Sequence, residues 1–149
     1  MDNEIKNKSV SVHKSFFDRA RAAFDNGYYL EAAMYEYAAI EGRLEVICGL
    51  LGCPCNKNLP PETRSMIKIS HRIKCLKALY KKHSACVNGA TKISSDFWDN
   101  LRHWTNSRNI YVHGLYKRPE LYEQRLAERK QLAEEGLELA RLLYNEANG

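Results

Sequence analysis

The segment from Tyr29 to about Leu51 constrains the fold more than any other part of the chain. Its apolar side chains recur at intervals of three and four residues, which places them on one face of an α-helix. They are Leu30, Ala33, Met34, Tyr37, Ile40, Leu44, Ile47, Cys48 and Leu51. Gly52 follows directly, and glycine is common just after the last turn of a helix. The pattern predicts a long helix with one face to bury.

A helical hairpin is predicted at this end of the chain. Apolar positions indicate an earlier helix from about Val10 to Phe24. It presents Val12, Phe16, Ala20, Ala23 and Phe24 on one side. The sequence Asp25-Asn26-Gly27 ends it, and such a short connection makes the two helices antiparallel.

The same hairpin also resembles a single tetratricopeptide-type unit. The residue pairs that carry this likeness are Ala23-Phe24, Gly27-Tyr28, Ala32-Ala33 and Tyr37-Ala38. A repeat protein needs roughly three or more such units, and no second copy follows at a spacing of about 34 residues. We therefore keep a lone repeat-like interaction module only as an alternative.

Turn residues divide the rest of the chain into three more predicted helices. Prolines make 53–61 a loop, and a third helix is expected over about Glu62–Val87. A fourth helix begins at Ser94 or Ser95 and ends at Gly114. Pro119 opens the last helix. The expected apolar positions are Met66, Ile69, Ile73, Leu76, Leu79 and Tyr80, then Phe97, Trp98, Leu101, Trp104, Arg108 (through its stem) and Val112, then Tyr122, Leu126, Leu132, Ala133, Leu137, Ala140 and Leu143.

The fold class expected from these elements is all-α, an antiparallel bundle of about five helices. A chain of 149 residues is long enough to form one domain with its own core, so we predict a single domain over 1–149. Residues 1–9 and 146–149 are expected to be poorly ordered.

Composition narrows the setting of the protein without deciding its function. The segment Met1-Asp2-Asn3-Glu4-Ile5-Lys6 is polar with no apolar run behind it, so we expect no signal peptide, no membrane association and a cytoplasmic location. A net charge of +5 suits a polyanionic partner, although it also favours solubility. The third helix carries a basic face that could hold an RNA backbone: Lys68, His71, Arg72, Lys74, Lys77, Lys81 and Lys82.

The five cysteines predict thiols rather than a disulfide framework, because their number is odd. The cluster Cys48-x4-Cys53-Pro54-Cys55 could supply half of a zinc site, but no matching pair recurs elsewhere. We therefore expect neither a metal nor a cofactor.

One stretch of the fourth helix carries groups suited to phosphate chemistry. Arg108 supplies a permanent cation, Asn109 an amide and His113 a titratable imidazole. An arginine followed at this spacing by a histidine is expected about once by chance in such a chain, and Arg64 with His71 gives a second match. Asn109 distinguishes the first match, because it shares a helix face with His113, about 40° away.

These residues resemble the HEPN superfamily, whose ribonucleases carry an arginine and a histidine separated by four to six residues, often with a polar residue after the arginine. Here the motif reads Arg108-Asn109-Ile110-Tyr111-Val112-His113. The resemblance implies a helical hairpin with an acidic position, which maps to Glu41, followed by the motif helix and a closing helix. We expect no linked nucleotide-sensing or nucleotidyltransferase domain, which is a departure from the family pattern.

The resemblance implies a metal-independent endoribonuclease that acts as a homodimer and leaves 2′,3′-cyclic phosphate ends. Cleavage needs a base and an acid, and one chain supplies one histidine of this kind, so two chains meeting at a two-fold axis would complete the site. His113 would transfer protons, Arg108 would bind the phosphate, and Asn109 would orient His113 or the phosphate. A toxin or defence effector restrained by an antitoxin or regulatory protein is one setting. The alternative is a non-catalytic interaction or nucleic-acid-binding module, in which Arg108 pairs with a carboxylate such as Glu41.

Overall fold

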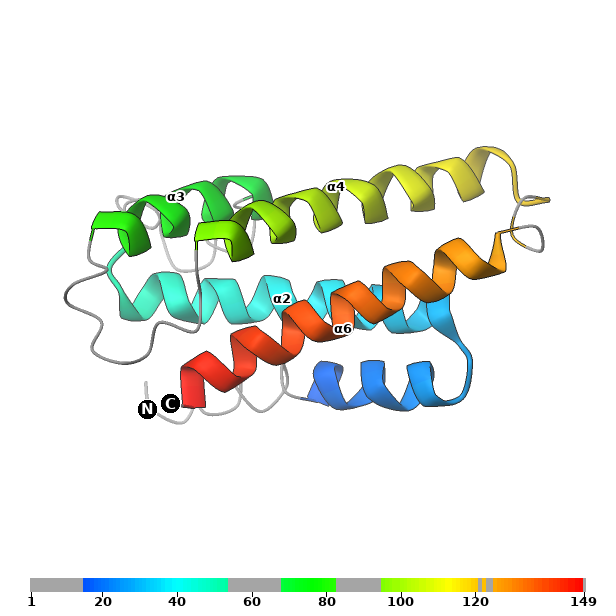
Figure 1. The fold of residues 1–149 in the computed structure, drawn as a ribbon, viewed down its shortest axis with the longest axis horizontal. Helices are drawn as coiled ribbons and strands as arrows, with labels where there is room; N and C mark the ends of the chain where they lie inside the picture. The colour runs from blue at the N-terminus through cyan, green and yellow to red at the C-terminus, as the bar shows by residue number, and fades with distance from the viewer. Residues whose placement is uncertain (1–14, 54–67, 83–94, 121, 123–124, 149) are drawn as a thin grey trace, which may run out of the picture.

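The computed structural model describes residues 15–53, 68–82, 95–120, 122 and 125–148. Within these ranges the chain forms five helices and no strand, which confirms the predicted all-α fold (Figure 1). The helices are residues 15–25, α2 (Tyr29–Leu50), α3 (Ile69–Lys82), α4 (Ser95–Lys117) and α6 (Leu126–Asn148). The parts of the predicted first and third helices that fall in 10–14, 62–67 and 83–87 lie outside the described residues.

The predicted hairpin between residues 15–25 and α2 is confirmed (Figure 1). Gly27 adopts a left-handed φ of 80°, and the Tyr28 backbone N–H donates to the Ala23 carbonyl at 2.8 Å. Gly52 repeats this arrangement at the end of α2, with φ of 61° and a bond from the Cys53 N–H to the Cys48 carbonyl at 2.9 Å. Both ends are the Schellman type, which glycine permits because it lacks a Cβ.

The expectation that Gly114 ends the motif helix is wrong. Helix α4 continues through it to Lys117, and the Arg118 N–H still donates to the Gly114 carbonyl at 2.9 Å. The helix ends at Lys117, so Arg118, the residue before Pro119, lies outside it. Proline disfavours the helical conformation of its predecessor and has no N–H to donate. Pro119 does not open the last helix either: it lies in a turn, and α6 begins only at Leu126.

The core lies where α6 crosses α2 and where α3 and α4 cover the other side of α2 (Figure 1). Trp98 and Trp104 are each 1% exposed, as their place on the apolar stripe predicted. Three residues assigned to buried faces are instead exposed at helix edges or ends: Met34, Leu51 and Leu126. The first helix buries Phe17, which the sequence analysis did not select, more fully than Phe16.

Gly136 of α6 packs against side chains from two other helices, α2 and α4. A Cβ at this position would collide with the Glu36 carboxylate from α2 and with the Trp104 ring from α4. The Trp104 ring is held in place because its Nε1–H donates to the Leu132 carbonyl at 2.9 Å. A glycine is therefore required here for packing, in a helical rather than a left-handed backbone.

Candidate functional site

The Arg108 guanidinium is positioned by two neighbours, one on its own helix and one on α2. Its Nη1–H donates to Asn109 Oδ1 at 2.9 Å, and its Cζ lies 4.2 Å from the centroid of the Tyr37 ring. The Nε atom is buried and has no hydrogen-bond partner among the described residues. Partial burial lowers the pKa of Arg108, while the Tyr37 and Glu41 side chains oppose that shift. Arg108 keeps its positive charge, because arginine does not deprotonate near neutral pH.

Glu41 lies one turn beyond Tyr37 on α2, and its carboxylate interacts electrostatically with the Arg108 guanidinium. Burial and repulsion by Glu45 raise the pKa of Glu41, while Arg72 and Arg108 oppose that rise. Arg108 nevertheless forms no ion pair with a described carboxylate. The Arg108–Glu41 pair expected of a structural arginine is therefore not formed.

Tyr37 connects the members of this group. Burial and then Glu41 raise the pKa of the Tyr37 hydroxyl, whereas Arg108 and a hydrogen bond with Asn109 act in the opposite direction. In the sequence, Tyr37 stands out only as a core position and as part of the repeat-like pair Tyr37-Ala38. Its place four residues before Glu41, on the same helix face, was the available signal. We call Tyr37, Glu41, Arg108 and Asn109 the arginine cluster.

His113 lies apart from Arg108 within the chain. It is exposed on α4, and five residues of helix separate the two side chains by about 140° around the axis. Arg108 contacts Tyr37 of α2, whereas His113 lies on the exposed side of α4. The Asn109 amide bonds to Arg108 through its Oδ1 atom.

The predicted basic face of α3 is smaller than expected. Lys74 is exposed, but Lys77 forms an ion pair with Asp99 of α4 at 2.6 Å, which neutralises its charge. Arg72 was placed on this face and is instead 2% exposed, so that placement is wrong. It lies close enough to Cys48 and Glu41 to influence both their pKa values. The side chains of Lys81 and Lys82 lie outside the described residues.

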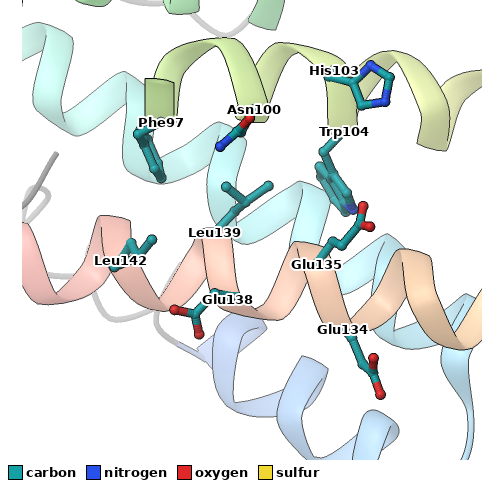
Figure 2. A pocket seen from close by; sticks show the side chains of 9 residues that line it. All are labelled: Phe97, Asn100, His103, Trp104, Glu134, Glu135, Glu138, Leu139 and Leu142. Carbon is teal, nitrogen blue, oxygen red and sulfur yellow. The ribbon is translucent and has the colours of Figure 1, made fainter. Parts of the chain in front are cut away.

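Two cavities flank α4 on its α6 side, and neither contains Arg108, Asn109 or His113. One of about 640 Å³ lies between α4 and α6 and is lined by nine side chains (Figure 2). A second, of about 300 Å³, is lined by Ser107, Ile110, Tyr111, Arg125, Glu128 and Leu132. The arginine cluster is formed by side chains of two helices, α2 and α4.

The described residues contain neither a candidate metal site nor a helix that could span a membrane. No three His, Cys, Asp or Glu side chains among them are grouped closely enough to hold a metal ion. Across the same residues, every helix falls short of the length and apolar character that crossing a bilayer requires.

Comparison of the chain with protein-family models, with curated proteins and with solved structures yields no match.

Proposed function

We propose that this protein is a metal-independent endoribonuclease of the HEPN type. The observation that supports this best is the state of Arg108: its guanidinium is held by Tyr37 and Asn109 and is paired with no described carboxylate. A positioned but uncompensated arginine is the group that stabilises negative charge on a phosphate as it is attacked.

The reaction would proceed by attack of a 2′-oxygen on the adjacent phosphorus. A base removes the 2′-hydroxyl proton, the bond to the 5′-oxygen breaks, and an acid protonates that departing oxygen. The products are a 2′,3′-cyclic phosphate and a 5′-hydroxyl. Imidazole can serve as base or acid, so two copies of His113 would fill both roles.

A homodimer in which α4 meets its own copy would supply the second histidine. Exposed apolar side chains stand beside His113 on the outer face of α4: Ile110 is 74% and Tyr116 is 89% exposed. Burial of such side chains against an identical face would stabilise the pair.

A non-catalytic interaction or nucleic-acid-binding module is the second candidate. It is favoured by the partial burial of Arg108 under Tyr37, which is also what an arginine with a packing role requires. The two candidates differ in whether His113, which is exposed and packs against no described core residue, matters to activity.

His113→Ala is therefore expected to lower the rate of RNA cleavage by at least about 100-fold, because it removes the proton-transfer group. The measurement is cleavage of an end-labelled single-stranded RNA in excess EDTA, with the product ends identified as cyclic phosphates. Since His113 is exposed, the variant should unfold at the same denaturant concentration as the wild type.

The matched control is His103→Ala, which removes another exposed histidine of α4. It should leave the rate unchanged, which would show that the loss in His113→Ala depends on that position and not on removing any histidine of this helix. Arg108→Lys, which keeps the charge but loses the planar guanidinium, should be slow as well. If all four proteins cleave equally, or none cleaves, the ribonuclease proposal is wrong and the binding module stands.

A further inference from the structure

The larger cavity between α4 and α6 changes character along its length. At one end the side chains are apolar: Phe97 and Leu139 are almost fully buried and Leu142 is half-buried (Figure 2). At the other end the Glu135 carboxylate lies between the helices beside the Trp104 ring (Figure 2). The Asn100 amide points into the space between these two ends. A ligand that fills the cavity must therefore be apolar at one end and polar at the other.

Glu135 brings a negative charge that no described cation neutralises. Its hydrogen-bond partner is the neutral Gln131 amide, which donates from Nε2 to Oε1 at 3.2 Å. The other carboxylates at the cavity differ: those of Glu134 and Glu138 lie on the side of α6 away from α4 (Figure 2). Glu138 is also paired with Arg141, whose Nη2 lies 2.6 Å from its Oε1. The His103 ring points away from α6 as well.

We propose that this cavity binds a small organic cation: an ammonium group attached to an apolar body. The ammonium would pair with Glu135 and the Asn100 oxygen beside the electron-rich Trp104 ring, and the body would cover Phe97, Leu139 and Leu142. A volume of about 640 Å³ lies in the range of small-molecule sites. An anion is excluded by Glu135, and a neutral apolar compound would leave that carboxylate partly desolvated without a partner.

The test uses the full chain and two probes of the same shape, 4-phenylbutylammonium and 4-phenylbutanol, titrated by calorimetry at pH 7. The cation should bind up to about fivefold more tightly than the alcohol, the size of effect expected for one partly exposed charge pair. Glu135→Gln should abolish this difference and leave binding of the alcohol unchanged.

Glu138→Gln is the matched control, because it removes the same charge from the same helix at a carboxylate that is already paired with Arg141. It should retain the preference for the cation. The proposal is overturned if both probes bind the wild type equally, if neither binds, or if the two glutamine variants lose the preference together. Binding is measured without RNA, so the outcome is independent of the ribonuclease proposal.

Discussion

Gly136→Ala is expected to destabilise the bundle by about 3 kcal/mol, although replacing glycine by alanine inside a helix normally stabilises it by up to about 1 kcal/mol. The added Cβ would collide with the Glu36 carboxylate and with the Trp104 ring. Neither neighbour can yield easily, because Glu36 is fully buried and the indole is 1% exposed and fixed by its bond to the Leu132 carbonyl. Relief requires α6 to move away from both α2 and α4.

The measurement is urea-induced unfolding, followed by tryptophan fluorescence and by circular dichroism. Gly114→Ala is the control, since Gly114 lies within α4 and a Cβ there meets nothing within 4 Å. That substitution should raise the free energy of unfolding by up to about 1 kcal/mol through helix propensity alone. Equal stability of Gly136→Ala and the wild type would mean that the three helices do not approach as closely as described.

The Gly114 control also shows why helix ends were harder to predict than helices. Gly27, Gly52 and Gly114 each follow an apolar helical pattern, so the sequence alone gives no reason to treat them differently. The first two adopt left-handed backbones and end their helices, whereas Gly114 does not. What distinguishes Gly114 is Pro119, five residues later, which ends α4 on its own.

Besides the helix ends, sequence patterns did not identify the polar residues in the core. Glu36 stands three residues after Ala33 and four before Ile40, so periodicity places it on the buried face of α2. Its charge argued against that placement, because a buried carboxylate needs a partner or a proton. Arg72 was placed on a solvated face for a similar reason, because it is a basic residue among lysines, but it is buried. Periodicity was the better guide in both positions.

The contacts within the candidate site could not be predicted from the sequence. The helical repeat alone fixes the angles between Arg108, Asn109 and His113, and thus shows that the arginine and histidine point in different directions. The contact between Arg108 and Tyr37 could not be foreseen, because it depends on how α2 and α4 are rotated and shifted against each other. The same holds for the cavity beside Glu135, which exists only where α4 and α6 diverge.

Glu36 should make the wild-type protein lose stability as the pH rises from 5 to 9. Burial raises the pKa of Glu36 from 4.5 to about 10, and its carboxylate oxygens have no hydrogen-bond partner among the described residues. Between these two values the folded state holds a proton that the unfolded state has released. The free energy of unfolding therefore falls with pH, by on the order of 1 kcal/mol per unit, and the contribution is complete only below pH 4.5.

Glu36→Gln isolates this effect, because the amide has nearly the same shape and cannot ionise. Unfolding in urea should be measured at pH 5, 7 and 9. The free energy of unfolding of the variant, relative to that of the wild type, should increase at each step. Burial also raises the pKa of Tyr144 to about 12 and of Cys48 to about 11, but both groups titrate above this range and are common to both proteins.

Glu138→Gln is the control, because the pKa of Glu138 is shifted in the opposite direction from that of Glu36. Its bond to Arg141 lowers the pKa of Glu138 below 4.5, so the stability it contributes is present above that pH and is lost only in more acidic solution. Between pH 5 and 9 the free energy of unfolding of this variant should change with pH in the same way as that of the wild type. If that of Glu36→Gln does so too, the Glu36 carboxyl is charged in the folded protein, and a cation or water must reach it inside the bundle.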